Sequence, residues 1–411
     1  MPSGIGDTFV PPDQVIPELF AMPEIFDFLP VFTLENSLMS NEKMSRSTYL
    51  TKNVGDYAGE IEINGLKFTK VDDLRYGTNP HQTAAYYQPA GRIGVIGGMQ
   101  VLKTGKGGLS QTNLEDISYA LNIVKFFDRP ACAVMKHVNP SGAAVAVPGD
   151  SLLDVYIKGR DSDPRAAFGS TTAFNVKVDA ATAREIMKLF TECVVAPDYD
   201  EEALKIFHDQ ETYKLNQHIR ILKCGDLGAL PKYVGDPVDG YRSMKVLADG
   251  SVVIADPLLT KVRGVADFAA AAGTNKALGE VKAAVAATAR QLDDLLIAWY
   301  INLNVRSNGV VIVKNGGTLA VGTGEQDRVG AVEQAVEKGK IKYAGKETLE
   351  GAVMSSDGFF PMPDGVEVAA KAGVKAIVAP SGSLKDADVV ARANALGVAL
   401  YHAPERIFSH H

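Results

Sequence analysis

Short runs of apolar, mostly β-branched residues alternate with stretches of helical periodicity from Val71 onward. A run that is apolar along its whole length predicts a strand buried on both faces of a sheet. Five runs have this character: residues 131–135, 194–196, 310–313, 376–379 and 398–401. Because strands that alternate with helices form layered structures, the pattern predicts an α/β fold.

Two stretches show the helical period clearly. In the first, apolar residues recur at helical spacing behind Thr112, the expected N-cap: Leu114, Ile117, Leu121 and Val124. In the second, Asp179 precedes a helical stretch that reaches Leu189. Residues 265–304 are rich in alanine and are expected to be helical, connecting two α/β halves.

Two pairs of segments resemble each other within the chain. Residues 133–146 resemble 310–322, and residues 193–204 resemble 376–390, in the same order. This favours a duplicated α/β unit, with chance similarity between common strand–turn segments as the alternative. Residues 1–68 lack steady periodicity and are expected to form an arm. The expected organisation is an N-terminal arm (1–68), a first α/β domain (69–232), a linker and helical connection (233–304) and a second α/β domain (305–411).

Length, composition and charge limit the class of protein. A chain of 411 residues exceeds the size of one core, so two domains are expected. The 46% apolar and 22% charged residues are typical of a folded globular protein. The net charge is −7 and no block of Lys and Arg follows the chain, which argues against a nucleic-acid partner. An anionic ligand would need locally placed cations.

Missing motifs exclude several further classes. Cys132, Cys193 and Cys224 form no CxxC pair and are expected to be reduced, buried thiols. We expect a cytoplasmic protein without a membrane partner, because no signal peptide or apolar run of about 20 residues is present. No GxGxxG or GxxxxGKS/T motif supports a nicotinamide or ATP phosphate loop. No HxE with PCxxC supports a zinc site.

Lys136 and His137 end a predicted buried strand and are followed by the turn 139–142. Open α/β sheets bind ligands at the carboxyl ends of their strands. A neighbouring ammonium disfavours protonation of an imidazole, so His137 is expected to stay neutral and act as a base. Both side chains reach one ligand only if the strand has already turned there. The alternative is a surface lysine beside a hydrogen-bonded turn histidine.

Three further clusters could contact a ligand. Residues 74–87 place Arg75 and Tyr76 on a turn, where the arginine could bind a phosphate or carboxylate; a rigid structural turn is the alternative. Residues 355–365 place Phe359 and Asp364 together, which suits a flat heterocycle; packing and helix capping are the alternative. The C-terminal residues 405–411 include Arg406, and a frayed end is the alternative.

Nine segments occur in one order along residues 71–410: LRYGTNPHQ, MKHVNPSGAAVAVP, AAFGS, VVAPDYDEEAL, RSNGVVIVKNG, GEQDRV, SSDGFFP, APSGS and RIFSHH. Taken together, they resemble the AICAR transformylases. The resemblance implies two duplicated cytidine-deaminase-like α/β/α domains without the zinc site, in a homodimer with sites at the subunit interface. It also implies the transfer of the formyl group of 10-formyltetrahydrofolate to the 5-amino group of AICAR ribonucleotide, giving FAICAR and tetrahydrofolate in de novo IMP synthesis.

The implied chemistry assigns roles to individual residues. The amine is a weak nucleophile, so the reaction needs proton removal and stabilisation of an oxyanion. By the resemblance, the catalytic residues are Lys136, His137, Asn308 and His410. The nucleotide would contact Arg75, Tyr76, Gly169, Glu192, Asn308, Arg328, Phe359 and Arg406, with Arg75 and Arg406 near its phosphate. The folate would contact Val329, Asp364, Ser383 and Leu384, with the Asp364 carboxylate accepting from the pterin N–H groups.

Some features depart from the family pattern. Glu192 stands where Asp is common, Pro363 where Arg often precedes the acid, and Leu384 where a small residue is usual. The ribose and folate contacts therefore stay open, and so does another formyl donor or a non-catalytic AICAR-binding homologue. The resemblance also suggests a monovalent cation, potassium, near Asp357.

The N-terminal region raises a separate expectation. Most relatives begin with a cyclohydrolase domain of about 200 residues. Residues 1–68 do not resemble that domain, so we expect no cyclohydrolase activity and a separate IMP cyclohydrolase in the pathway.

Overall fold

The structure is a computed structural model that describes residues 47–238, 240–342 and 347–410. Residues 1–46 of the expected arm lie outside the described residues. The rest of that arm contains the 3-10 helix Thr48–Leu50 and strand β1 (Glu60–Ile63). Strand β1 pairs with β2 (Leu66–Asp73), which pairs with β3 (Ala85–Pro89) in a three-stranded antiparallel sheet. The end of the expected arm is therefore regular sheet.

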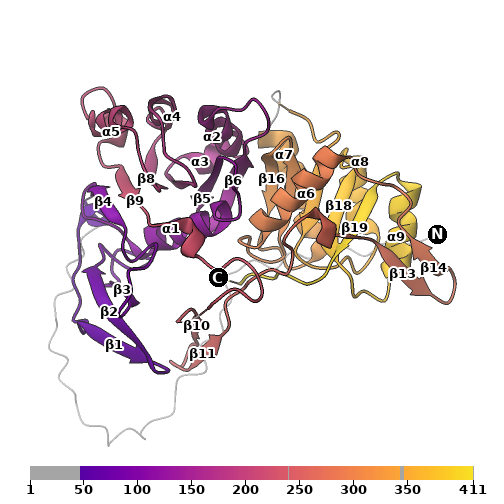
Figure 1. The fold of residues 1–411 in the computed structure, drawn as a ribbon, viewed down its shortest axis with the longest axis horizontal. Helices are drawn as coiled ribbons and strands as arrows, with labels where there is room; N and C mark the ends of the chain where they lie inside the picture. Colours follow the sequence, from indigo (N-terminus) through magenta and orange to yellow (C-terminus); the bar gives the residue numbers. More distant parts are fainter. Residues whose placement is uncertain (1–46, 239, 343–346, 411) are drawn as a thin grey trace, which may run out of the picture. The chain divides into compact units, whose positions relative to one another are not determined.

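The described residues contain a twelve-stranded mixed sheet. Figure 1 shows its strands flanked by helices. Its second half, in spatial order, is β12 (Ala269–Ala270), β19 (Ala399–Ala403), β18 (Ala376–Pro380), β17 (Val353–Ser356), β15 (Val310–Lys314) and β16 (Gly317–Gly322). Its first half continues with β6 (Asn139–Val145), β5 (Ala131–Lys136), β7 (Ser170–Phe174), β8 (Thr191–Ala196), β9 (Arg220–Lys223) and β4 (Gln100–Lys103). The five strands expected from the sequence are present, and the α/β prediction is confirmed.

The two halves of the sheet repeat one connectivity. In each half, a central strand is antiparallel to both neighbours: β5 lies between β6 and β7, and β15 lies between β16 and β17. Two parallel pairings and a final antiparallel edge strand follow in both halves. Both internal sequence similarities fall on equivalent elements. The likeness of these units to cytidine deaminases stays a prediction.

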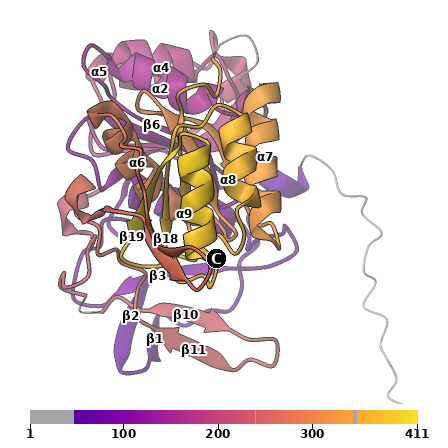
Figure 2. The same cartoon turned by 90° about the vertical axis from the view of Figure 1, so that its right-hand side faces the viewer.

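Helices cover both faces of the sheet and also repeat. On one face, α1 (Gln111–Val124) and α6 (Ala289–Asn302) pack with alternate strand residues in one core. On the other face, the first half has α2 (Leu152–Asp161), α3 (Pro164–Ala167), α4 (Ala180–Ile186) and α5 (Glu201–His208). The second half has α7 (Arg328–Lys342), α8 (Asp364–Lys371) and α9 (Asp386–Ala395), which Figure 2 shows side by side. The strands are therefore apolar on both faces because helices bury both.

The halves join where β6 pairs with β16 through few backbone contacts. There the Thr318 hydroxyl accepts from Ala143 N at 2.9 Å and donates to Ala143 O at 3.1 Å. Val145 N donates to Gly316 O at 2.8 Å. The side chain of Thr318 thus takes the place of a backbone partner, and the sheet continues across the junction.

Several predicted boundaries were wrong. Helix α1 begins behind Ser110, not Thr112, because Ser110 and Asn113 form a reciprocal capping box. Asp179 caps α4 as expected, but the helix ends at Ile186 and a turn follows. Only residues 289–302 of the expected helical connection 265–304 are α-helical.

The remainder of that connection forms strands. Alanine favours helix, but Gly273 and Gly279 interrupt the segment. It folds as β12 and as the hairpin of β13 (Ala272–Asn275) and β14 (Gly279–Lys282). The hairpin packs on α9 so closely that a Cβ at Gly273 would lie 2.3 Å from Ala387 N. Helix α6 takes the place in the second half that α1 takes in the first.

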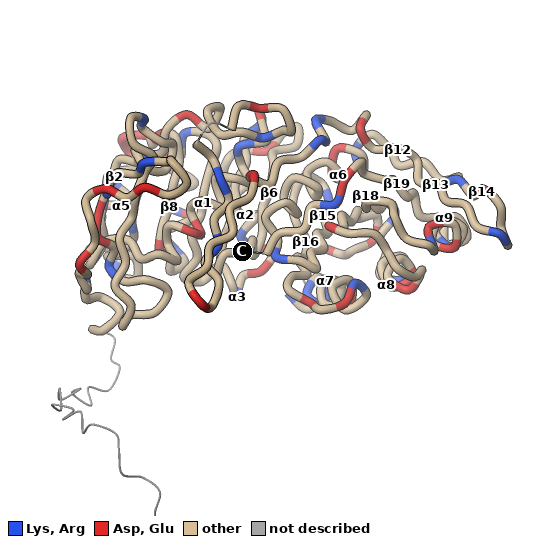
Figure 3. The backbone as a smooth tube through the Cα atoms, turned by 90° about the horizontal axis from the view of Figure 1, so that it is seen from below, with Lys and Arg blue, Asp and Glu red and all other residues tan. Residues whose placement is uncertain are grey.

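A separate hairpin of β10 (Ser243–Val246) and β11 (Val252–Ala255) pairs with no other strand in the described residues. No helix of the described residues is long and apolar enough to cross a membrane. Figure 3 shows Lys and Arg interspersed with Asp and Glu along the described backbone. Any cationic site must therefore be built from a few individual side chains.

Candidate active site

The Lys136–His137 pair lies at the tight turn of the β5–β6 hairpin. Lys136 is the last residue of β5 and pairs with Asn139, so His137 and Val138 form a two-residue loop. Both have positive φ, 55° and 64°, as type I′ hairpin loops require. The strand has therefore turned at this pair, which is the condition under which both side chains can reach one ligand.

Lys136 extends from this turn toward the loop before β7. Its Nζ donates to Gly169 O at 2.7 Å, and a Cβ at Gly169 would lie 3.0 Å from that nitrogen. Gly169 has φ +73° and is buried. Both the conformation and the close approach therefore explain the glycine, and the structure brings two of the predicted site residues together.

We call the first cluster the Lys136–His137 turn and Gly169 together with Arg75, Tyr76 and Glu192. Arg75 stacks over the Tyr76 ring at 4.6 Å and donates to Asn113 Oδ1 at 3.4 Å. Asn113 in turn donates to Glu192 Oε2 at 2.8 Å. Burial lowers the pKa of Arg75, and Arg220 lowers it further. The Arg75 Nε is buried without a hydrogen-bond partner among the described residues, so the guanidinium keeps an unused donor.

Asp116 of α1 lies behind the His137 turn. Its Oδ1 accepts from Val138 N at 2.6 Å, and the side chain is buried. Burial raises the pKa of Asp116 to about 7, although the Val138 hydrogen bond and Lys136 oppose the shift. Neither Asn113 nor Asp116 was assigned a role from the sequence. The signal that could have found them is that both interrupt the apolar face of α1.

A second cluster surrounds Arg328, at the start of α7. Its Nη2 donates to Asn308 Oδ1 at 2.5 Å, and its Nη1 donates to Asp357. Asn308 also donates from Nδ2 to Glu325 O at 2.8 Å. Arg328 and Asp357 are both buried, so their ion pair holds the guanidinium that donates to the Asn308 amide oxygen.

Phe408 joins the C-terminal residues to this second cluster. The guanidinium carbon of Arg406 lies 4.3 Å and that of Arg328 lies 5.8 Å from the Phe408 ring centroid. The His410 ring packs edge-on at 5.9 Å from the same ring. Ile407 N donates to Asp357 O at 3.1 Å, so the tail is anchored and not frayed. Phe408 lies in the C-terminal segment that the sequence singled out, but its motif assigned it no role in the site.

The predicted folate residues lie around the starts of α7 and α8 and the loop before α9. A Cβ at Gly382, which precedes Ser383, would lie 3.6 Å from the Phe359 ring. Val329 follows Arg328, Asp364 is exposed at the start of α8, and Leu384 is 96% exposed. Asp364 accepts only from the adjacent Gly365 N among the described residues, so its carboxylate is accessible.

The segments that carry the two clusters contact each other at Asn139. Asn139 Oδ1 accepts from Arg306 N at 3.0 Å and from the Thr323 hydroxyl at 2.8 Å. Among the described residues, no hydrogen bond or ion pair joins Lys136 or His137 to Asn308, Arg328 or His410. Each cluster therefore forms its own set of hydrogen bonds among the described residues.

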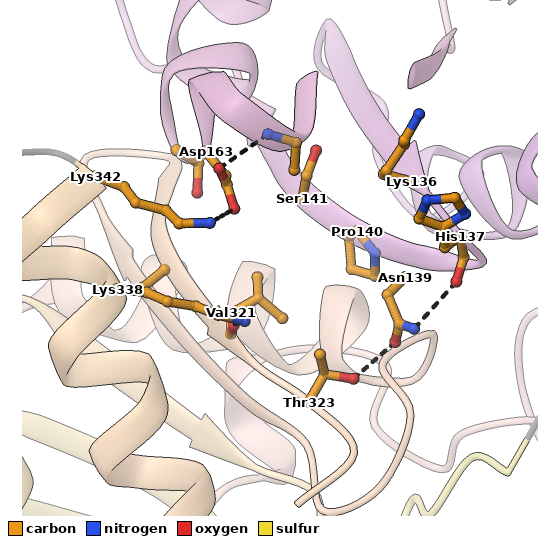
Figure 4. Close-up of a pocket in the computed structure, with 13 residues that line it drawn as sticks. Lys136, His137, Asn139, Pro140, Ser141, Asp163, Val321, Thr323, Lys338 and Lys342 are labelled. Carbon is orange, nitrogen blue, oxygen red and sulfur yellow. Dashed lines mark hydrogen bonds and ion pairs between the residues drawn. The ribbon is translucent and has the colours of Figure 1, made fainter. Parts of the chain in front are cut away.

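A cavity of about 240 Å³ lies beside the His137 turn, between the two halves. Figure 4 shows the Lys136 and His137 side chains at one end, with Ser141 and Asp163 facing Lys338 and Lys342 across it. Lys342 pairs with Asp163. The His137 ring is exposed at the mouth of this cavity, where a ligand can reach it.

Fold and clusters together define an α/β protein with a histidine–lysine turn between two sheet strands and two groups of side chains around the buried residues Arg75 and Arg328. A family model described as AICARFT/IMPCHase bienzyme matches residues 39–338. The chain belongs to this family.

Curated relatives agree with this assignment. A protein named "Bifunctional purine biosynthesis protein PurH" from Magnetococcus marinus is 37% identical over 85% of this chain and 61% of its own length. Proteins of the same name from Oceanobacillus iheyensis and Clostridium perfringens are 38% and 32% identical over 90% and 91% of this chain. Both matches cover 65% of the relative. The chain thus spans less than two thirds of the curated relatives that it matches.

Proposed function

We propose that the protein acts in purine biosynthesis by transferring a formyl group from 10-formyltetrahydrofolate to the 5-amino group of AICAR ribonucleotide. The observation that supports this most directly is the His137 turn, where an exposed imidazole lies next to the Lys136 ammonium and Gly169, and helix α1 connects this turn to the buried Arg75 through Asp116 and Asn113. The products are FAICAR and tetrahydrofolate. Family membership supports the same chemistry.

His137 acts as the general base in this proposal. As the amine nitrogen bonds to the formyl carbon, the imidazole takes the amine proton. The bond from the formyl carbon to N10 of the folate then breaks, and the proton passes to N10. Lys136 retains N–H donors beyond its bond to Gly169 O and stabilises the oxyanion on the formyl carbon.

The second cluster completes the site from another copy of the chain. Asn308 is held by Arg328 and Glu325 and orients the carboxamide or the formyl oxygen. Arg75 of one copy and Arg406 of the other hold the phosphate, and His410 lies near the reacting atoms. Two observations support a homodimer: no hydrogen bond or ion pair joins the two clusters among the described residues, and the β10–β11 hairpin exposes Val246, Val252 and Val253. An isolated hairpin of this kind is marginally stable in water.

The folate lies against Phe359, with Asp364 accepting hydrogen bonds from the pterin. Val329, Ser383 and Leu384 form the rest of that surface. Each half of the sheet is, in this proposal, a cytidine-deaminase-like unit without zinc, which the repeated connectivity supports.

A monovalent cation such as potassium fits beside Asp357. Asp357 Oδ2 and Asn302 Oδ1 are buried without hydrogen-bond partners among the described residues. Both border Gly309, where a Cβ would lie 2.5 Å from Asn302 Oδ1 and 3.3 Å from Asp357 Oδ2. Oxygen ligands of this kind suit a hard cation, which would stabilise the negative charge of the buried Asp357 carboxylate.

The test is a formyl-transfer assay with AICAR ribonucleotide and three donors: 10-formyltetrahydrofolate, formyl phosphate, and formate with ATP. We expect turnover with the folate alone. Turnover with either other donor, but not with the folate, would identify a different formyl donor. Tight nucleotide binding without turnover from any donor would identify a non-catalytic binding protein and refute the proposal.

A further inference from the structure

We infer that Asp116 is a positioning residue, which holds the backbone turn that presents His137 and Lys136 to the reacting amine. This rests on the proposed function. The Asp116 carboxylate accepts from Val138 N at 2.6 Å, directly behind the exposed imidazole.

The turn needs such support because its residues are poorly suited to it. His137 and Val138 both have positive φ, and a β-branched residue rarely adopts the left-handed region. Strained backbone of this kind persists only when surrounding groups fix it, and it is common at functional sites. Asp116 is 5% exposed and supplies a rigid acceptor from the middle of α1.

The second half of the chain has the same aspartate–turn hydrogen bond, but without the strained β-branched residue. Asp294 occupies the same position in α6, six residues after the N-cap, as Asp116 does in α1. It accepts from Asn315 N at 2.9 Å and from Gly316 N at 2.8 Å in the equivalent β15–β16 loop. There the second loop residue is glycine, with φ +79°, which adopts this conformation freely.

The two turns distinguish a structural role of the aspartate–backbone hydrogen bond from a catalytic role. Both aspartates hold a hairpin turn, but only the first turn bears an imidazole. In the second turn, Asn315 takes the place of His137, and the preceding Lys314 is paired with Glu347 at 2.8 Å. Loss of Asp294 should therefore affect folding alone, whereas loss of Asp116 should also misplace His137.

The test compares Asp116→Ala, Asp116→Asn and Asp294→Ala as full-length chains, with folded fraction measured by circular dichroism. We expect Asp116→Ala to lower kcat about 10- to 100-fold with little change in the nucleotide KM, because a small displacement of a reacting group has this effect. Asp116→Asn keeps an acceptor oxygen and should retain kcat within about threefold. Asp294→Ala should leave kcat unchanged, even if its unfolding midpoint falls.

The inference is overturned if Asp116→Ala keeps the wild-type kcat, if Asp116→Asn falls as far as Asp116→Ala, or if Asp294→Ala loses as much activity. A wild type without formyl transfer would instead refute the proposed function. In that case a crystal structure of Asp116→Ala decides the inference separately. It predicts a displaced 137–138 turn, and an unchanged turn would overturn it.

Discussion

At position 137 an exposed imidazole follows a lysine whose ammonium is already oriented by Gly169 O. As a candidate base it could be singled out from the sequence only together with the other motifs, because the pair alone favours a surface lysine beside a turn histidine. The residues that fix this arrangement could not. Asn113 and Asp116 act through contacts with residues 79 and 22 positions away, and such contacts depend on the packing of α1 against the sheet.

Replacing His137 by Ala should remove the base and leave the nucleotide contacts of Arg75 intact. We expect kcat to fall roughly 10²- to 10⁴-fold, the usual contribution of a general base. Steady-state kinetics with AICAR ribonucleotide measure the change. The matched control is His208→Ala, on α5 outside both clusters, which should keep wild-type turnover. Equal losses in both variants would contradict the assignment.

At the scale of elements, the buried strands were predictable because each is apolar along its whole length. The strands within residues 265–288 were not predictable, because alanine favours helix. The glycines and the packing against α9 make this region form strands instead. The N-cap of α1 was misplaced by two residues because Ser110 and Thr112 are both acceptable caps. Ser110 is the cap because Asn113 completes the reciprocal hydrogen bonds.

The junction of the two sheet halves depends on a glycine at 316. A Cβ there would lie 2.3 Å from Val145 O, and φ is +79°. Gly91 has nearly the same φ, +78°, with nothing within 4 Å of a Cβ. Gly316→Ala should therefore lower the free energy of unfolding by about 2 kcal/mol more than Gly91→Ala. Urea denaturation measures both, and equal losses would show that the close approach is unimportant.

The end of α1 should make stability depend on pH. Burial lowers the pKa of Lys125 to about 7, with Nζ donating to Pro231 O. Between about pH 7 and the ordinary value of 10.5, the unfolded chain binds more protons, so stability rises with pH. Lys125→Met should flatten this rise by about 1–2 kcal/mol between pH 7 and 9. Parallel urea-denaturation profiles for both proteins would contradict the shift.

At the scale of the whole molecule, the repeated connectivity was foreshadowed by two short sequence similarities. The positions of the two clusters relative to each other could not be predicted from the sequence, because they depend on the pairing of β6 with β16. In the proposed function, a second copy of the chain brings the two clusters together. The exposed β10–β11 hairpin is the element that we expect to take part in that contact.

The hairpin offers a direct test of association. Val253 is 48% exposed on β11, and a charge there would be costly to bury in an interface. Val253→Asp should shift the protein toward monomer in analytical ultracentrifugation and lower turnover with it. Leu215→Asp changes an equally exposed apolar residue outside the hairpin and should leave the dimer intact. A Val253→Asp dimer with full turnover would exclude the hairpin from the interface.

The most direct measurement is a crystal structure with AICAR ribonucleotide bound. The account predicts the 5-amino nitrogen within hydrogen-bonding distance of the His137 imidazole, with Arg75 on the phosphate and Asn308 of a second copy on the carboxamide. A nucleotide bound away from residue 137, with no arginine on its phosphate, would contradict it.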